Sequence, residues 1–194
     1  SFEELNNIDI QIHHMALNYM FNRFKISKQL IDKQQFFDVG CNSGSFVKSL
    51  GAFNIKNNIH CFEPHPVLSK KTKEVYPYIK MNEFCLSNNN NELVLNVPTW
   101  SVGLSSVIER PVFTSLHDKG QEINKLTVQC KTVEEYCEKN DIKNIFFMKI
   151  DVEGAEKLVL DGASNMLKNK KIIGGLFEVG ETLKDANTSE SEIC

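Results

Sequence analysis

Short apolar runs alternate along this chain with stretches in which apolar residues recur every three or four positions. The first run spans residues 34–38, ends in an acid, and leads through a glycine-bracketed loop into residues 46–53, which follow helical spacing. Further apolar runs begin at Ile59 and Ile145. Because strands that alternate with helices usually pair in parallel, the pattern predicts an α/β fold with a doubly wound, mostly parallel sheet that helices cover on both faces.

The same periodicity places the other elements. An amphipathic stretch at residues 8–30 predicts one or two helices before the first strand, and residues 100–120, which lack a period, predict a loop. Thr132 followed by Glu135 has the spacing of a helix N-cap, and the last helix is expected to break at Gly162. The remaining helices are expected at 67–76, 132–140 and 155–169, and the remaining strands at 59–64, 84–86, 92–98, 125–131, 145–154 and 171–180, the last of them buried.

The chain divides into three segments. Its 194 residues are enough for one domain with a sizeable buried core. We expect an N-terminal helical segment at 1–33, a ligand-binding α/β domain at 34–180, and a flexible polar tail at 181–194.

Composition and charge narrow the classes of function. Hydrophobic residues make up 41% of the chain and charged residues 24%, as in ordinary soluble domains. The net charge of -3 supplies no global attraction to nucleic acid, and the local lysine clusters at 70–73 and 168–171 fit solvated helix ends, so no nucleic-acid partner is expected. No segment approaches the apolar length that spans a bilayer, and no signal peptide opens the chain, so no membrane partner is expected.

The six cysteines are scattered and favour a reducing environment. They form no C-x-x-C pair and no Cys/His cluster with zinc spacing, and several lie in apolar segments, where a free thiol packs as a small hydrophobe. We therefore expect no disulfide framework and a cytoplasmic protein. The cysteines are Cys41, Cys61, Cys85, Cys130, Cys137 and Cys194.

Acidic residues end the predicted strands, at Asp38, Glu63, Asp151, Glu153 and Glu178. In a parallel sheet the carboxyl ends of the strands meet at one edge, which is where such folds bind ligands. A single acid at a strand end often occurs by chance, whereas acids at the ends of successive apolar runs favour a site. The sequence therefore predicts an acidic pocket at the carboxyl edge of the sheet.

The loop after the first strand, Asp38-Val-Gly-Cys-Asn-Ser-Gly44, indicates the type of ligand. It departs from the G-x-G-x-x-G pattern of dinucleotide sites, and its leading acid would repel a phosphate. Glu63, at the end of the second strand, is placed to accept hydrogen bonds from ribose hydroxyls. A cationic, ribose-bearing ligand without pyrophosphate fits both features, and S-adenosylmethionine has this chemistry. Taken alone, Gly40 and Gly44 fit an ordinary tight turn equally well.

Five segments resemble, in this order, the FkbM-type methyltransferase family: FFDVGCNSGSF, HCFEPHP, EFCLSNNNNE, VGLSSVIE and FMKIDVEGAEKLVLDGA. The resemblance covers about residues 36–179, and KIDVEGAE is its most distinctive piece. The resemblance implies a class I methyltransferase fold with a Rossmann-like sheet, S-adenosylmethionine bound by the domain at 34–180, and O-methylation, often of sugar hydroxyls. The chain stops soon after Glu178, so we expect the sheet to lack the C-terminal hairpin that normally closes this fold and to expose an edge.

The resemblance also assigns cofactor roles to individual positions. Cys41 stands in the cofactor loop where the family usually has alanine, Glu63 matches the acid that binds the ribose, and Leu86 and Ser87 match the segment beside the adenine. The predicted cofactor-binding residues are Asp38, Gly40, Cys41, Asn42, Gly44, Phe46, Glu63, Pro64, Leu86, Ser87 and Asp151.

Methyl transfer to a hydroxyl needs an aligned acceptor and benefits from a general base. The predicted catalytic residues are Asp151, Glu153, Lys149 and Glu178. Lys149 could orient a carboxylate or lower the pKa of the acceptor hydroxyl; alternatively, its stem is buried and its head reaches solvent. Glu153 could instead favour the start of the next helix. No metal is predicted, although Asp151 and Glu153 could also bind a divalent cation.

Three functions remain open at this point. The first is O-methylation of a sugar, glycan or other small hydroxylated acceptor, the second is methylation of RNA or protein, and the third is a non-catalytic methyltransferase-like module of a larger protein. The missing basic face argues against RNA. The loop at 102–109 could close over the acceptor, and His117 could contact it, while His60 and His65 are expected to be structural. Trp100 could stack on a sugar ring, although a place in the core is slightly favoured. Nothing in the sequence indicates an oligomeric state.

Overall fold

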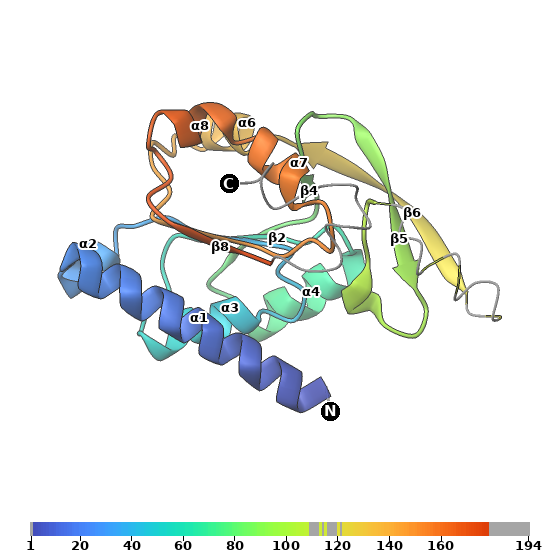
Figure 1. Ribbon diagram of the computed structural model, residues 1–194, viewed down its shortest axis with the longest axis horizontal. Helices are drawn as coiled ribbons and strands as arrows, with labels where there is room; N and C mark the ends of the chain where they lie inside the picture. The colour runs from blue at the N-terminus through green and yellow to red at the C-terminus, as the bar shows by residue number, and fades with distance from the viewer. Residues whose placement is uncertain (1, 109–112, 114, 116–119, 121, 179–194) are drawn as a thin grey trace.

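A sheet of five parallel strands lies at the centre of the molecule, between two layers of helices (Figure 1). The computed structural model describes residues 2–108, 113, 115, 120 and 122–178. In chain order the elements are α1 (Phe2–Phe24), α2 (Lys28–Ile31), β1 (Phe36–Val39), α3 (Ser45–Ala52), β2 (Ile59–Phe62), α4 (Pro66–Val75), β3 (Lys80–Asn82), β4 (Cys85–Leu86), β5 (Glu92–Pro98), the 3-10 helix η1 (Val102–Leu104), β6 (Ile123–Lys131), α6 (Val133–Lys139), β7 (Phe147–Ile150), α7 (Glu156–Asp161), α8 (Ser164–Lys168) and β8 (Gly175–Phe177).

The strand order of the central sheet is β3-β2-β1-β7-β8, and each neighbouring pair is parallel. From β1 the chain moves outward to β3, and it later returns to β7 and moves to β8 on the other side. The order therefore reverses between β1 and β7, and open α/β sheets bind ligands at such a switch point. The predicted fold class, a doubly wound and mostly parallel α/β sheet, is confirmed.

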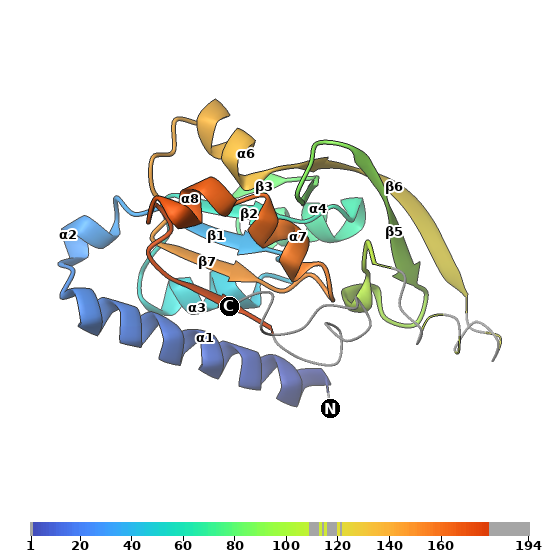
Figure 2. The same ribbon diagram turned by 45° about the horizontal axis from the view of Figure 1, so that its top comes forward.

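Apolar side chains form a separate core on each face of this sheet. Phe36 and Phe37 are adjacent in β1 and both fully buried, yet they belong to opposite cores because side chains alternate along a strand. Phe36 packs in the layer that contains α1 and α3, and Phe37 packs in the layer that contains α6, α7 and α8 (Figures 1 and 2). Leu17 anchors α1 in the first of these cores.

A second, smaller sheet lies beside the central sheet. The sequence does not predict this second sheet. Its order is β4-β6-β5, with β6 parallel to β4 and antiparallel to β5. Figure 2 shows β5 and β6 side by side. It has its own apolar core around Leu95. These three strands are predicted at the right places in the chain but wrongly assigned to a single sheet, because periodicity contains no information on which strands pair.

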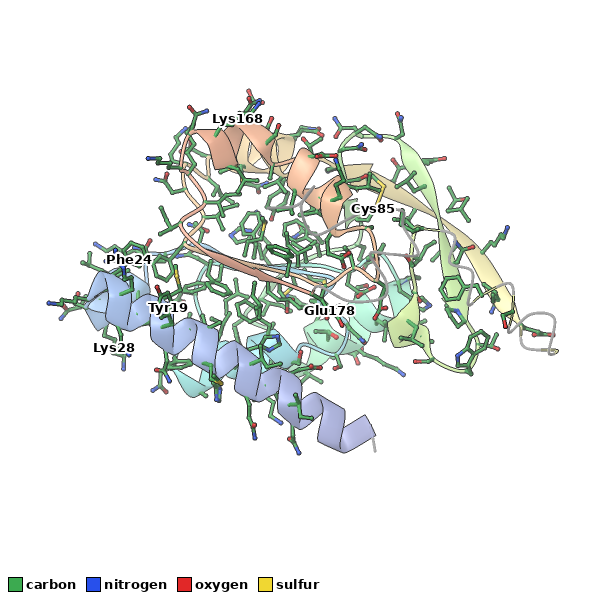
Figure 3. The ribbon with its side chains drawn as sticks, in the orientation of Figure 1. Tyr19, Phe24, Lys28, Cys85, Lys168 and Glu178 are labelled. Atoms are coloured by element: carbon green, nitrogen blue, oxygen red, sulfur yellow. A yellow bond between two sulfur atoms is a disulfide. The ribbon has the colours of Figure 1, made fainter. Side chains whose placement is uncertain are left out.

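A disulfide joins β4 to β6 within this second sheet. Cys85 and Cys130 are register partners in the two strands, although they are 45 residues apart in the sequence (Figure 3). This bridge corrects the expectation of free thiols, because only the folded pairing brings the two cysteines together. Cys41, Cys61 and Cys137 are buried free thiols, as expected for cysteines in apolar segments.

The two edges of the central sheet also differ from the prediction. β3 is absent from the predicted strands, because its three residues show no alternation of buried and exposed positions. β8 is predicted to be buried, yet Gly175 is exposed and Phe177 only partly buried, since no described strand pairs with its outer side. The expected lack of a closing hairpin and the tail predicted at 181–194 concern residues outside the described part of the chain.

Two local predictions about helices are confirmed. Thr132 caps α6, because its hydroxyl accepts a hydrogen bond of 3.0 Å from the backbone N–H of Glu135. The helix expected at 155–169 breaks at Gly162 into α7 and α8. A β-carbon added at Gly162 would lie 2.0 Å from the backbone oxygen of Ser87. Glycine therefore allows this break to pack directly against the chain that follows β4.

The amphipathic stretch predicted at residues 8–30 forms α1 and α2. One side of α1 is buried through Leu17 and Met20, while Met15 and Tyr19 are exposed on the other side (Figure 3). Within the described ranges, no helix combines the length and the hydropathy needed to cross a bilayer.

Gly162→Ala tests the close approach at the helix break. The added methyl group would overlap the Ser87 carbonyl, so we expect the free energy of unfolding to fall by about 1–3 kcal/mol, as in overpacked cores. Gly51→Ala is the matched control: the nearest atom to its added β-carbon is the Tyr78 hydroxyl at 3.8 Å. Alanine there should stabilise α3 by up to about 1 kcal/mol. Urea unfolding followed by circular dichroism measures both, and a Gly162→Ala variant as stable as the wild type would contradict the clash.

Candidate active site

A cavity of about 360 Å³ opens at the carboxyl edge of the central sheet. Residues at the ends of β1, β2, β7 and β8 form one side of it, and residues of β4, β5 and η1 form the other. The volume falls in the range of small-molecule sites. The charged side chains that line it, among the described residues, are Asp9, Glu63, Lys149, Asp151, Glu153 and Glu178.

The loop after β1 lies directly against the loop after β7. Gly40 has a φ of 73°, and a β-carbon added there would lie 1.9 Å from the backbone oxygen of Asp151. Both the positive φ and the close approach require glycine. Asn42, two residues later, also has a positive φ of 44°, and its backbone N–H donates a hydrogen bond to Glu63. The backbone conformation of the loop thus sets the position of a side chain that follows the neighbouring strand.

Glu63 is a buried carboxylate in the cavity wall, just after β2. Its two oxygens accept hydrogen bonds from the backbone N–H groups of Asn42, at 3.0 Å, and His65, at 2.9 Å. Burial raises the pKa of Glu63 to about 7, although the two hydrogen bonds act in the opposite direction. The carboxylate therefore titrates near neutral pH, and it keeps lone pairs for donors inside the cavity.

Lys149 connects the two strands at the switch point. It is the register partner of Asp38, and its Nζ lies 3.3 Å from Asp38 Oδ1 and 3.3 Å from Asp151 Oδ2. It also donates a hydrogen bond of 2.8 Å to the Gly40 carbonyl. Only 5% of the side chain is exposed, so the alternative in which its head reaches solvent is wrong. Burial by itself would lower the pKa of Lys149, but the charges of Asp151 and Asp38 outweigh burial and raise it.

Asp151 and Glu178 are interacting carboxylates that bind protons differently. Burial would raise the pKa of Asp151, but Lys149 outweighs burial and lowers that pKa below its ordinary value. Glu178 lies at the end of β8 (Figure 3), and its pKa is raised to about 7, first by burial and then by the charge of Asp151. Near neutral pH, Asp151 is therefore an anion and Glu178 exchanges a proton.

The fold brings most of the predicted site residues together at this cavity. All the predicted catalytic residues line it: Asp151, Glu153, Lys149 and Glu178. The predicted cofactor residues that line it are Gly40, Cys41, Asn42, Glu63, Pro64, Leu86 and Asp151. Apart from Leu86 in β4, these residues lie at or just after the ends of β1, β2, β7 and β8, so the strand-end rule accounts for their convergence.

Other predicted cofactor residues lie behind the cavity wall, namely Asp38, Gly44, Phe46 and Ser87. Asp38 is fully buried beneath the cavity and is paired with Lys149. Phe46 is fully buried in the core under the sheet, where it stacks on Phe147 with ring centroids 5.7 Å apart. Asp38 and Phe46 point into the protein because β1 and α3 pack that face, and Ser87 is buried. The assignment of these positions to the cofactor site stays a prediction.

Sequence reasoning missed Asp9, which lines the cavity from α1. An acid within an amphipathic helical pattern gives no signal of a site, and only the packing of α1 brings this one to the sheet edge. The segment expected to cover the acceptor, at 102–109, does line the cavity through η1, as far as it is described.

The aromatic and histidine candidates have mostly structural contacts. His60 uses both ring nitrogens for hydrogen bonds of 2.8 Å, and His65 binds Glu63 through its backbone N–H, as their structural assignment predicts. Trp100 does not line the cavity, and the expectation that it is a core residue is wrong, because it is 37% exposed. His117 lies outside the described residues.

Three carboxylates in the cavity could hold a metal ion. Asp151, Glu153 and Glu178 each offer a ligand atom, and these atoms lie within 4.8 Å of one another. Oxygen ligands of this kind suit a divalent cation. Asp151 also has a cationic partner within the protein, because Lys149 Nζ, which it shares with Asp38, lies 3.3 Å from its carboxylate. The sequence-based expectation of no metal stays a prediction.

Comparison with known proteins identifies the family of the chain. Residues 38–192 match the family described as Methyltransferase FkbM domain. Over 165 residues the chain is 23% identical to the 2-O-methyltransferase NoeI of Sinorhizobium fredii (strain NBRC 101917 / NGR234), an alignment that covers 77% of this chain and 67% of that protein. No solved structure matches the chain. Because the family match spans most of the chain and contains the strand-end acids of the cavity, the protein belongs to the FkbM methyltransferase family and is a methyltransferase.

Proposed function

We propose that the protein is an S-adenosylmethionine-dependent O-methyltransferase that acts on a hydroxyl of a sugar or another small molecule. The observation that carries this proposal is the single cavity that combines the buried carboxylate of Glu63 with the interacting pair Asp151 and Glu178. Family membership supplies the reaction class, which is methyl transfer. The similarity to a 2-O-methyltransferase supports oxygen as the atom that is methylated.

The chemistry of the cavity fits a cationic nucleoside as the methyl donor. Glu63 has free lone pairs for ribose hydroxyls, and Leu86 and Pro64 add apolar surface nearby for a base. The acidic lining favours a positively charged sulfonium over a cofactor that carries phosphate. When bound, S-adenosylmethionine supplies a methyl group on cationic sulfur for in-line transfer to oxygen.

Asp151 is proposed to orient the acceptor. Lys149 keeps it ionised, so its carboxylate can accept a hydrogen bond from the hydroxyl that is to be methylated. The ammonium is itself fixed by Asp38 and by the Gly40 carbonyl, so Asp151 is held by groups that cannot easily move. Such preorganisation aligns the acceptor oxygen with the methyl group.

Glu178 is proposed to act as the general base. A base works best when its pKa lies near the working pH, because it is then often ionised and still binds a proton well. The pKa of Glu178 is about 7, whereas the lowered pKa of Asp151 makes Asp151 a weaker base. The negative charge of Glu153 contributes to the raised pKa of Glu178. Glu178 would accept the hydroxyl proton as the new carbon–oxygen bond forms.

Two measurements test this function. Calorimetry with S-adenosylmethionine, S-adenosylhomocysteine and NADH should show binding of the first two and none of NADH. Transfer of a radiolabelled methyl group, assayed over methyl glycosides, short RNAs and peptides, should place the label on a glycoside as a methyl ether. Label on RNA or peptide alone, or NADH binding without S-adenosylmethionine binding, would overturn the proposal.

Glu63→Gln tests the contact with the ribose. The variant should bind S-adenosylmethionine about tenfold more weakly or worse, because charge-assisted hydrogen bonds are lost. In the wild type, affinity should fall as the pH drops through about 7, where Glu63 becomes protonated, and the variant should lose this dependence. Calorimetry on both sides of neutral pH measures these effects, with Glu83→Gln, an exposed glutamate outside the cavity, as the control. Wild-type affinity in the variant at every pH would exclude Glu63 from the donor site.

Glu178→Gln tests the base. We expect kcat to fall by about 10²–10⁴-fold, the usual contribution of general-base catalysis. With both substrates saturating, the kcat of the wild type should rise with pH through about 7 as Glu178 loses its proton, and the variant should not show this rise. Saturating donor removes the effect of Glu63, which acts on affinity. If the variant keeps the pH profile of the wild type, another group is the base.

Asp151→Asn should lower kcat by about tenfold or more, because the fixed anion that orients the hydroxyl is lost. Affinity for S-adenosylmethionine, measured by calorimetry, should change far less. An equal loss of donor affinity would assign Asp151 to donor binding instead. Assays after EDTA treatment complete the test, since activity that is lost and then restored by Mg²⁺ would reassign this carboxylate as a metal ligand.

A further inference from the structure

α1 contributes a carboxylate to the cavity from outside the matched part of the chain. Asp9 lines the cavity together with Asp151, Glu153 and Glu178. The family match, however, begins at residue 38. Family membership therefore says nothing about Asp9, and a role for it must come from its surroundings.

Asp9 is exposed, but packing holds the part of α1 that carries it in a defined position. His13 follows one helical turn later on the same side of α1, is 5% exposed, and contacts Phe46 edge-on with ring centroids 5.4 Å apart. Leu17, one further turn along, is fully buried. The side of α1 that carries Asp9 thus packs against α3 and the sheet. This packing fixes the position of the helix from which Asp9 extends to the cavity.

The carboxylate oxygens of Asp9 can accept hydrogen bonds, and no described residue donates one to them. The carboxylate makes no hydrogen bond or ion pair within the described part of the chain, and the cation of the cavity, Lys149, is shared by Asp38 and Asp151. Burial, followed by the negative charge of Asp151, raises the pKa of Asp9. A carboxylate that is partly desolvated beside other acids favours a ligand that brings hydrogen-bond donors.

We propose that Asp9 binds the acceptor by accepting hydrogen bonds from hydroxyls next to the one that is methylated. The inference rests on the proposed function. A sugar ring presents adjacent hydroxyls, so one can meet Asp151 while a neighbour meets Asp9. The same charges repel a phosphate or carboxylate on the acceptor. The acceptor is therefore an uncharged polyhydroxyl compound.

Asp9→Asn and Asp9→Ala separate acceptor binding from donor binding. With the methyl glycoside that the wild type methylates best, KM for the glycoside should rise about tenfold in Asp9→Asn and further in Asp9→Ala, as charge-assisted hydrogen bonds are lost. Affinity for S-adenosylmethionine and kcat at saturating glycoside should stay at wild-type values. Asp32→Asn is the matched control, because it removes the same charge at the end of α2, outside the cavity lining. Thermal unfolding verifies that each variant is folded.

The phosphate ester of the same glycoside extends the test. It should be a poor acceptor for the wild type and a better one for Asp9→Asn. A glycoside KM within twofold of the wild type in both Asp9 variants overturns the inference and leaves the proposed function intact. A parallel loss of donor affinity also overturns it, because Asp9 would then serve the donor. If the wild type neither binds S-adenosylmethionine nor methylates a glycoside, the proposed function itself fails, and the inference fails with it.

Discussion

The buried ion pair between Lys149 and Asp38 is the interaction on which the site depends. It links register partners of β1 and β7 where the strand order reverses, and the two side chains are 5% and 0% exposed. A buried charge that loses its partner is strongly destabilising, so each of these residues requires the other. The same ammonium reaches Asp151 and the Gly40 carbonyl, which belong to the two loops at the mouth of the cavity. One cation thus positions both loops.

This ion pair also explains how neighbouring acids come to differ. Asp151 lies beside the cation and has a lowered pKa, whereas Glu178 lies beside the anion that results and has a pKa of about 7. Glu63 reaches a similar pKa by another route, since burial outweighs its two backbone hydrogen bonds. Pairs of acids whose surroundings separate their pKa values are a common basis for acid and base roles. Among Asp151, Glu178 and Glu63, the surroundings therefore keep the first ionised and give the other two pKa values of about 7.

The sequence predicts the parts of this arrangement that follow from chain order. Acids that end successive apolar runs must meet at one edge of a parallel sheet, and Glu63, Asp151 and Glu178 do so. Chain order does not predict which side chains face the cavity: Asp38 and Phe46, both predicted cofactor residues, are buried and do not line it. Strand pairing in the second sheet depends on tertiary contacts, and so does the position of Asp9 in the cavity lining. Hydrophobic periodicity indicates only which side of an element is buried. It therefore predicts neither the strand pairing of the second sheet nor the position of Asp9 at the cavity.

The cavity is lined partly by the family's domain and partly by a helix that precedes the matched residues. The loops after β1, β2 and β7 lie within residues 38–192 and belong to the family's domain, whereas α1 precedes that range and reaches the cavity through Asp9. α1 packs on the core through Leu17 and Met20, and it is not part of the sheet. Residues of α1 that line the cavity, such as Asp9, can therefore be substituted while the sheet and the Lys149 ion pair keep their geometry. In the proposed reaction, the sheet loops would then supply the chemistry and the N-terminal helix would select the acceptor, a division that suits a rigid scaffold with variable attachments.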